Sequence, residues 1–596
     1  MNPFPEKLAL LRGVMKENNI EIYIIPSTDP HLGEYVPDHW NVIDWLVGFT
    51  GSAATVVITA EFAGLWTDSR YFKQAENQLY GTGCTLMKPE LPDKKDFIGW
   101  LSENIKAGSK VGLDGRTFSI TLTRKMEKQM EGKKVSFDFY CDLISDIWAD
   151  RPPMPTSTAF DHPVMFCGKD RTEKIIKVRE EMKIQNLHYH LLTSVDDIMW
   201  LLNIRGNDVQ YSPLLTSYAI VGEEQILLFT DEKKISMKLA SEFDKLDVVI
   251  LPYDGTSNIL STLSAGSSIL ITPGTTSVSL FNSLNQDITI IEDISIPSRL
   301  KAIKNRVEIQ NIGKVMIKDG VALTRFFYWI EQNSDLVPMS ELSLTKKLND
   351  LRSEQEHYLG PSFSTIMAFN EHGALPHYTV TSDTDSVTNQ QGILLIDSGG
   401  QYLDGTTDIT RTISIGIPTL MQKKDFTLVL KGTINIAMAK FPSGTRGYQL
   451  DILARKALWE NGLNYGHGTG HGVGFCLNVH EGPHNIGTGT GSDPISVIEP
   501  GMLFSDEPAI YREGEYGIRI ENLILCYEDE ETEYGTFLKF NTLSLCYIDK
   551  TLIDIDLLNK IEIGWLNTYH TEVFEKLSPY LTHEEKNWLK DKTSAF

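Results

Sequence analysis

Four acidic residues and one histidine in the last third of the sequence have the types and spacing of a metal site: Asp397, Asp408, His471, Glu507 and Glu521. Four converging carboxylates would repel one another and raise each other's pKa, whereas two divalent cations would balance their charge. A hydroxide held between two such ions is a nucleophile at neutral pH. If these side chains converge, we therefore expect metal-assisted hydrolysis.

The first two aspartates flank a glycine-rich turn. The apolar run 391–396 predicts a strand that ends at Asp397, and the alternation of isoleucine with polar residues predicts a second strand over 408–415, which Asp408 begins. If the two strands pair as a hairpin, the carboxylates can converge. The alternative is that Asp397 and Asp404 are ordinary turn residues beside glycine.

The histidine lies in a stretch where His467 and His471 alternate with glycines. A histidine pair at i and i+4 is often a helical zinc motif, but glycines at 466, 468, 470, 472 and 474 argue against a helix. We expect extended or irregular backbone that approaches something closely; a plain glycine-rich loop is the alternative. His480 follows a few residues later.

The two glutamates stand in separate short stretches. Glu507 precedes a proline, and Glu521 belongs to an alternating stretch in which Ile518 and Ile520 share one strand face while Arg519 and Glu521 share the other. Arg519 can therefore orient an acidic neighbour. A surface ion pair on an edge strand is the alternative interpretation.

Together these motifs resemble those of the metallopeptidase family of methionine aminopeptidase, prolidase and aminopeptidase P, whose catalytic domain has the pita-bread fold. They are most similar to the three-domain, cytosolic-type aminopeptidase P, also called Xaa-Pro aminopeptidase, and the similarity extends to 565–570. The matching segments are 374–378, 404–411, 467–474, 478–483 and 517–522.

The resemblance implies a role for each metal ligand. Asp397 would bind one ion through both oxygens, Asp408 and Glu521 would bridge two ions, and His471 with Glu507 would complete the second. Oxygen ligands outnumber the single imidazole, so the site suits Mn²⁺ better than a site rich in thiolate or imidazole ligands, which is typical of zinc, would. Zn²⁺ and Co²⁺ are the alternative metals.

The reaction that the resemblance implies is attack of a metal-bridging hydroxide on the carbonyl before a penultimate proline. Glu507 would shuttle the proton, His480 would stabilise the oxyanion, and His377 would handle the substrate or leaving group. His467 and Tyr511 would line the proline pocket. The residues expected to contact substrate are His377, His467, His480, Tyr511 and Arg519.

One residue departs from the family pattern. The family usually has glycine after the Glu-Pro pair, whereas Ala509 stands here. If the backbone at this position needs a positive φ, alanine costs about 1 kcal/mol. The wall of the substrate pocket is the part that this departure affects.

Composition limits the classes of function. A formal charge of −24 discourages binding to nucleic acid or to an anionic membrane. The first residues lack a signal-peptide pattern, and no run approaches the ~20 apolar residues of a membrane span. The 6 cysteines have no CxxC spacing, which favours reduced thiols. We therefore expect a cytoplasmic protein.

A length of 596 residues predicts three or four domains. Alternating helix and strand patterns predict an α/β unit over 1–153, including a helix at 6–17, and the prolines of 150–155 suggest a linker. A second α/β unit over 154–300 repeats a faint outline of the first, since Trp45-Leu46 and Trp200-Leu201 each precede a similar strand. Chance similarity is the alternative.

The third predicted unit, 301–596, follows the start of a helix-period segment at 299–328 and ends with an amphipathic segment at 557–589. The resemblance implies two creatinase-like α/β domains before a pita-bread catalytic domain, hence an α/β and α+β multidomain chain, and a homodimer.

Other members of the family are the competing interpretations. A prolidase-type Xaa-Pro dipeptidase shares the metal set, but the length and the segment 517–522 favour the aminopeptidase. Two large N-terminal units would be surplus in a methionine aminopeptidase. In a catalytically silent pita-bread binding protein we would expect some of the five metal ligands to be replaced, whereas all five are present.

Overall fold

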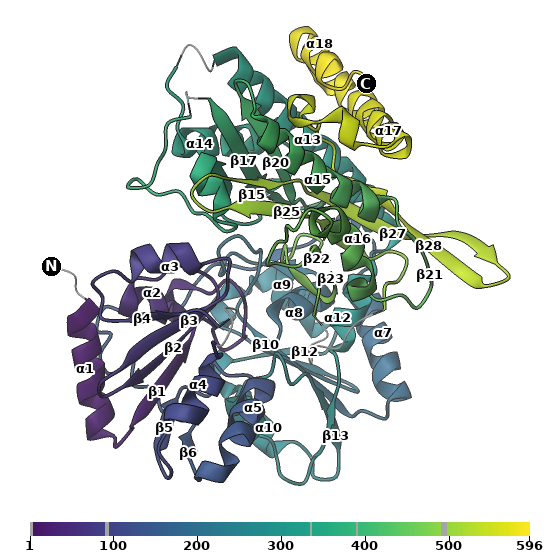
Figure 1. The fold of residues 1–596 in the computed structure, drawn as a ribbon. Helices are drawn as coiled ribbons and strands as arrows, with labels where there is room; N and C mark the ends of the chain where they lie inside the picture. Colours follow the sequence, from purple (N-terminus) through teal and green to yellow (C-terminus); the bar gives the residue numbers. More distant parts are fainter. Residues whose placement is uncertain (1–3, 90–93, 334–336, 389–390, 490–496) are drawn as a thin grey trace. The chain divides into compact units, whose positions relative to one another are not determined.

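The computed structural model describes residues 4–89, 94–333, 337–388, 391–489 and 497–596. The chain divides into two compact units (Figure 1). The first comprises Met1–Asp161 and Lys169–Pro297, and the second comprises His162–Gly168 and Ser298–Phe596. No helix of the described residues is long and apolar enough to cross a membrane.

The first unit contains two six-stranded sheets, of order β4-β3-β2-β1-β5-β6 and β12-β11-β10-β8-β13-β14. The strands of the first sheet are β1 (Ile22–Pro26), β2 (Ala54–Thr59), β3 (Ala63–Thr67), β4 (Thr85–Met87), β5 (Lys110–Leu113) and β6 (Ser136–Asp138). Those of the second are β8 (Tyr189–Leu192), β10 (Tyr218–Gly222), β11 (Ile226–Phe229), β12 (Val248–Leu251), β13 (Ser268–Ile271) and β14 (Thr289–Glu292). A small sheet pairs β7 (Phe160–Asp161) with β9 (Ile204–Arg205).

The two large sheets have the same topology. Each has a meander of three antiparallel strands, then a parallel strand at one edge, with two parallel strands on the other side of the first strand. The predicted repeat is therefore confirmed, and Trp45 and Trp200 lie in equivalent helices. The helices with these sheets are α1 (Phe4–Glu17), α2 (Val42–Val47), α3 (Phe72–Gln78), α4 (Phe97–Asn104), α5 (Ile120–Met130), α7 (Arg171–Ile184), α8 (Val195–Leu202), α9 (Met237–Asp244), α10 (Thr256–Thr262) and α11 (Val278–Asn282).

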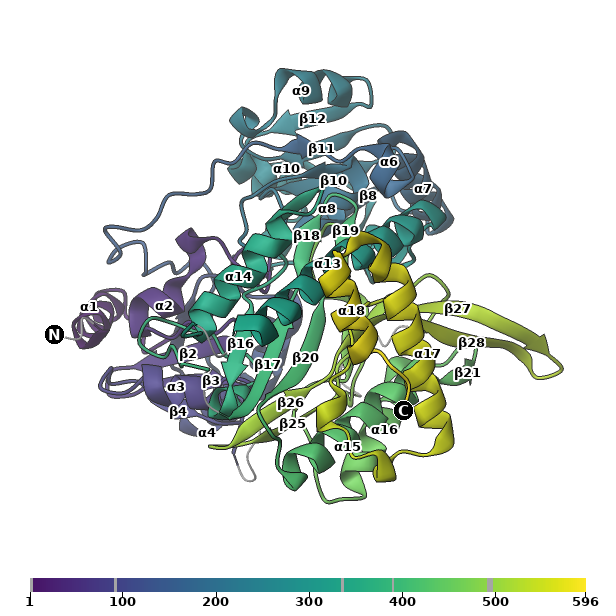
Figure 2. The same ribbon diagram turned by 90° about the horizontal axis from the view of Figure 1, so that it is seen from above.

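The second unit is built on antiparallel strands. Figure 2 shows β16, β17 and β20 side by side, and the larger sheet has the order β21-β28-β27-β24-β22-β23. The strands are β15 (Tyr358–Pro361), β16 (Ile366–Phe369), β17 (Gly392–Ser398), β18 (Gly400–Tyr402), β19 (Gly405–Thr406), β20 (Ile409–Ile415), β21 (Lys440–Pro442), β22 (Gly470–Gly472), β23 (Glu481–Ile486), β24 (Leu503–Asp506), β25 (Ala509–Arg512), β26 (Tyr516–Arg519), β27 (Asn522–Thr532) and β28 (Gly535–Thr542).

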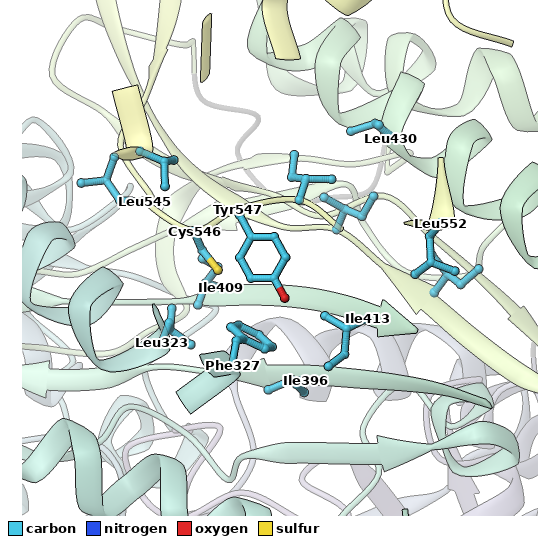
Figure 3. Packing of buried hydrophobic residues seen from close by; sticks show 14 of the residues in the cluster. Leu323, Phe327, Ile396, Ile409, Ile413, Leu430, Leu545, Cys546, Tyr547 and Leu552 are labelled. Atoms are coloured by element: carbon cyan, nitrogen blue, oxygen red, sulfur yellow. The ribbon is translucent and has the colours of Figure 1, made fainter. Parts of the chain in front are cut away.

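Helices pack around these sheets, and the longest is α13. The helices are α6 (Val164–Cys167), α12 (Ile296–Ala302), α13 (Arg306–Asn333), α14 (Glu341–Ser353), α15 (Leu420–Ala437), α16 (Gly447–Trp459), α17 (Lys560–Leu577) and α18 (His583–Lys592). The stripe predicted on α13 is buried at Ile312, Met316, Leu323 and Phe327. In Figure 3, Tyr547 lies close to Phe327 in this core, with their ring centroids 5.4 Å apart.

Two predicted helical segments are interrupted. The segment 299–328 breaks between α12 and α13, because the Lys304 amide donates to the Gly501 carbonyl at 2.9 Å instead of continuing a helix. The segment 557–589 divides into α17 and α18 at a short 3₁₀ turn that contains Pro579. The apolar stripe predicted for the first segment begins at Ile309, inside α13, so it carries no information about the break before Arg306.

Candidate active site

The predicted aspartate hairpin is present. β17 and β20 pair antiparallel, with Asp397 opposite Thr410, and Asp408 directly precedes β20. The short strands β18 and β19 form the connection between them. Asp397 lies within β17 and is buried, which excludes its interpretation as an ordinary turn residue, whereas Asp404 does lie in a turn, between β18 and β19.

The glycines around His471 are needed by close strand packing. His471 lies in β22, between β23 and β24. A Cβ on Gly470 would lie 2.0 Å from the Ser505 carbonyl oxygen, and one on Gly472 would lie 2.1 Å from the Glu481 carbonyl oxygen. The prediction of extended backbone with close main-chain approach is therefore confirmed.

Hydrogen bonds fix the orientation of the His471 ring. Its Nδ1–H donates to the Gly472 carbonyl at 2.9 Å, so Nε2 is the atom turned toward the carboxylates. It lies 3.4 Å from Asp408 Oδ2 and 3.6 Å from Glu507 Oε1. A backbone acceptor on one ring nitrogen that leaves the other for an ion is the usual arrangement of a metal-binding histidine.

The two glutamates are positioned from neighbouring strands. The Glu507 amide donates to the Thr469 carbonyl at 2.7 Å, and Ser505 Oγ donates to Glu507 Oε1 at 3.2 Å. Glu521 Oε2 accepts from Thr410 Oγ1 at 2.8 Å. Each carboxylate is thus oriented by a hydroxyl, as ligating carboxylates commonly are.

The side chains converge in a pattern that fits divalent ions. Ligand atoms of Asp408, His471 and Glu521 all lie within 4.8 Å of one another. Asp397 Oδ1 is buried without a hydrogen-bond partner. Burying an unpaired carboxylate oxygen is costly unless a group outside the chain, such as a cation, binds it. The donor set of oxygens with one imidazole nitrogen suits a divalent transition-metal ion.

Electrostatics lead to the same conclusion. Burial raises the pKa of Asp397, and although Arg519 opposes this rise, the charge of Asp408 adds to it. Burial, followed by the charges of Asp408 and Glu507, raises the pKa of Glu521 well above its ordinary value. Divalent cations would relieve this repulsion.

The same carboxylates act on His471. Burial lowers the pKa of the imidazole, but the hydrogen bond to Asp408 and the charge of Glu507 outweigh it and raise the pKa to about 9. Without a cation the ring is therefore protonated at neutral pH. A metal ion must displace that proton to bind.

Arg519 is the centre of a buried network, not part of a surface ion pair. It is 2% exposed. Its Nη2 donates to Asp397 Oδ2 at 2.5 Å, and its Nη1 donates to the Tyr511 hydroxyl at 2.6 Å. The alternation of β26 correctly predicted that Arg519 orients an acidic neighbour, while its contact with substrate stays a prediction.

The remaining predicted residues lie next to this network. The Tyr511 hydroxyl is 2.8 Å from His467 Nε2, and the ring of His480 meets that of His471 edge-on with centroids 4.3 Å apart. His377 is half-buried and follows Pro376, whose carbonyl accepts from Arg519 at 3.4 Å. The structure therefore brings the predicted histidines and Tyr511 to the surroundings of the carboxylates.

The strain considered for Ala509 does not arise. Ala509 begins β25, pairs with Arg519 across the strands, and does not have a positive φ. Its methyl group is buried. Alanine is therefore compatible with the backbone at the position where the family usually has glycine.

Sequence reasoning missed several supporting residues. Thr410 and Ser505 orient the glutamates, and Glu481 is held by two buried lysines, Lys304 at 2.6 Å and Lys301 at 3.4 Å. The period-two pattern of β20 could have indicated Thr410, because it shares a strand face with Asp408. The lysines are distant in sequence and carry no such signal.

Family models match almost the whole chain. Residues 7–138 and 150–308 match the Creatinase/Prolidase N-terminal domain in two versions, and residues 310–528 match metallopeptidase family M24. Residues 536–596 match the C-terminal region of the same peptidases. Fold and site thus define a metallopeptidase with two creatinase-type domains ahead of a pita-bread domain.

Relatives that match over their full length identify the group within this family. A probable Xaa-Pro aminopeptidase P of Talaromyces marneffei is 39% identical over 99% of this chain and 92% of its own length, and one of Laccaria bicolor is 37% identical over 99% and 93%. A crystal structure of X-prolyl aminopeptidase from Caenorhabditis elegans, described as a cytosolic enzyme with a di-nuclear active site, has a TM-score of 0.95, 35% identity and 99% coverage of both chains. The chain belongs to the Xaa-Pro aminopeptidase P group of metallopeptidase family M24.

Proposed function

We propose that this protein removes the N-terminal residue from peptides that have proline in the second position. The observation that carries the proposal is the convergence of Asp408, His471 and Glu521, beside Asp397 and Glu507, in a chain that is similar to Xaa-Pro aminopeptidases over nearly its full length. A prolidase-type dipeptidase is the second candidate, and full-length similarity favours the aminopeptidase.

We propose that Asp397, Asp408, His471, Glu507 and Glu521 hold two divalent ions. Mn²⁺ is favoured because four carboxylates and one imidazole form a site rich in oxygen. When bound, such ions lower the pKa of water toward neutrality and polarise a carbonyl group. The buried, unpartnered Oδ1 of Asp397 supports its place among the ligands.

Three side chains carry the proton and charge movements of the proposed reaction. Glu507 takes a proton and returns it to the leaving proline nitrogen; burial raises its pKa, which suits an acid–base group at neutral pH. His480, next to the His471 ring, donates to the developing oxyanion. His377 contacts the substrate or the leaving group.

The proline ring gives the specificity. The bond before proline is a tertiary amide without an N–H, and the ring fixes φ, so a site that reads an extended chain through that donor rejects it. We assign the proline pocket to His467 and Tyr511, which hydrogen-bond each other at 2.8 Å. Arg519 holds Tyr511 from behind and completes the substrate-binding set.

We further propose three domains, at 1–153, 154–300 and 301–596, a homodimer, and a cytoplasmic location. The location is supported by six buried cysteines, none of which forms a disulfide within the residues that the structure describes, and by the Caenorhabditis elegans relative, which is named a cytosolic enzyme. Sedimentation of the purified protein tests the dimer.

The decisive experiment is hydrolysis of an Xaa-Pro-Xaa tripeptide by chelator-treated protein with and without added Mn²⁺. We expect activity to return with about two ions per chain, and Glu521→Gln to remain inactive. An Xaa-Pro dipeptide and an N-acetylated tripeptide are the specificity controls. Preferential cleavage of the dipeptide would indicate the prolidase-type function instead, and full cleavage of the acetylated peptide would contradict an exopeptidase.

A further inference from the structure

A buried carboxylate outside the metal site holds the segment that carries His377. Glu341, the first residue of α14, is 0% exposed. Its Oε1 accepts from the Phe369 amide at 2.8 Å, and its Oε2 accepts from the Tyr378 hydroxyl at 2.9 Å and from the Ser386 amide at 3.1 Å. One side chain thus accepts hydrogen bonds from the last residue of β16 and from two positions in the connection that follows it.

A histidine in the same connection is paired with Glu341. His372 Nδ1 donates to Glu341 Oε1 at 2.8 Å, and the His372 ring stacks on Tyr378 with centroids 4.4 Å apart. Burial lowers the pKa of His372, but the hydrogen bond and charge of Glu341 outweigh it and raise the pKa. A buried carboxylate is stable only when it is paired and hydrogen-bonded in this way.

The connection between β16 and β17 has little regular structure of its own. Residues 370–388 contain one 3₁₀ turn at Asn370–Ala374 and are otherwise irregular up to an isolated bridge at Val387. Short irregular segments of this kind are stabilised mainly by side-chain contacts. The hydrogen bonds to Glu341 are therefore among the contacts that order the segment.

The opposite side of the connection contacts the active-site strand β26. A Cβ on Gly517 would lie 1.7 Å from the Gly373 carbonyl oxygen, so the two backbones touch. Arg519 donates to the Pro376 carbonyl at 3.4 Å. His377 lies between Pro376, which is held by the metal-site arginine, and Tyr378, which is held by Glu341.

We propose that Glu341 is a positioning residue for His377: by holding Phe369, Tyr378 and Ser386, it presents the His377 imidazole to the substrate. This inference rests on the substrate contact proposed for His377. A role for Glu341 in stability alone, as an acidic residue in the first turn of α14, gives a different experimental result.

The test is a double-mutant cycle of Glu341→Gln and His377→Ala in the metal-loaded full chain, with an Xaa-Pro-Xaa substrate. Glutamine keeps the shape of the side chain, but its amide NH₂ group replaces one carboxylate oxygen and therefore faces groups that donate hydrogen bonds. We expect Glu341→Gln to lower kcat/KM about 10- to 100-fold, with two metal ions per chain retained. In the His377→Ala background it should cause little further loss, because the effect passes through that residue.

A second readout does not depend on activity. Amide hydrogen exchange in peptides from 369–386 should become at least about tenfold faster in Glu341→Gln, while exchange in β22 and β24 stays unchanged. Asp350→Asn, an exposed carboxylate on the same helix, is the matched control and should behave as wild type. If Glu341→Gln does not fold, Tyr378→Phe removes one of the donors and should change both readouts in the same direction.

Several outcomes would overturn the proposal. Additive losses in the double variant, unchanged exchange, or a lower melting temperature with normal kinetics would each show that Glu341 does not act through His377. A wild-type level of activity in His377→Ala would do the same. If instead the wild-type protein cleaves no proline peptide, the proposed function fails, and the exchange experiment still decides whether Glu341 holds the segment.

Discussion

Arg411 Nη1 donates a 2.6 Å hydrogen bond to the main-chain carbonyl of Glu521, the proposed bridging ligand. The same guanidinium donates through Nη2 to Asn522 Oδ1 and to the Tyr569 hydroxyl, both at 2.8 Å, and to the Cys546 carbonyl at 2.9 Å. Arg411 is 2% exposed. The C-terminal residues beyond 536 are therefore part of the support for a proposed metal ligand.

Because of this contact, we expect a substitution in helix α17 to weaken metal binding. Tyr569→Phe removes an acceptor of the buried guanidinium, so we expect the free energy of unfolding to fall by about 1–3 kcal/mol. Affinity for Mn²⁺ should fall about tenfold, as is typical when support behind a ligand is lost. Calorimetric titration measures the affinity. Tyr534→Phe, 81% exposed, is the control, and unchanged affinity in Tyr569→Phe would refute the link.

Metal binding should depend on pH through His471. Its pKa is raised to about 9 in the metal-free site, so the folded apo protein carries a proton that a metal ion must displace at pH 7. We expect the apparent Mn²⁺ affinity to rise by up to about tenfold per pH unit between pH 6.5 and 8.5, with proton release on binding. Titration in buffers of different ionisation enthalpy counts the protons. A constant affinity over this range would contradict the protonation state assigned to His471.

Removing one of the two lysines that contact Glu481 should cause a large loss of stability that further substitutions can recover. Lys304 and Glu481 form a 2.6 Å ion pair with side chains 1% and 0% exposed. Lys304→Met leaves Glu481 to the more distant Lys301, and we expect a loss of about 3–5 kcal/mol. Adding both Glu481→Gln and Lys301→Met should recover most of it, because no buried charge of the group is then left without its opposite charge. Urea unfolding of the single and triple variants measures this; equal losses in both would mean that packing, not charge, is responsible.

Local patterns were sufficient to predict the backbone around several of the proposed metal ligands. Strand alternation assigned Arg519 and Glu521 to one face, and glycine density around His471 excluded a helix, because both signals depend only on neighbouring residues. Burial was harder to predict, because Arg519 and Glu521 resemble a surface ion pair in sequence. Both side chains are buried: Arg519 donates to the Tyr511 hydroxyl of β25, and the connection between β16 and β17 touches β26 at Gly517.

Long-range partners were beyond sequence reasoning. The pattern of 299–328 gives no sign of the break between α12 and α13, where the Lys304 amide donates to the carbonyl of Gly501, far along the chain. Glu341 is likewise an ordinary first-turn glutamate in sequence. Its importance comes from Phe369, Tyr378 and Ser386, whose proximity depends on the tertiary fold.

The C-terminal helix α17 also predicts sensitivity to acid. Burial, followed by the charges of Lys550 and Arg411, lowers the pKa of His570 to about 3, whereas an unfolded histidine titrates near 6.5. Below pH 6.5 the unfolded chain therefore binds a proton that the folded chain does not. The free energy of unfolding should fall by up to about 1.4 kcal/mol per pH unit from this group.

His570→Gln isolates that contribution, because glutamine can still accept from the Ile548 amide, which lies 3.1 Å from His570 Nε2, but does not titrate. We expect the wild type to be the more stable at pH 7.5 and its advantage to shrink or reverse at pH 5, since only wild-type His570 must stay uncharged. Urea unfolding at both pH values measures the gap, and the titration of other groups cancels between the two proteins. His583→Gln, exposed on α18, should keep a constant gap to the wild type. A constant gap for His570→Gln as well would show that His570 does not oppose protonation in the folded state.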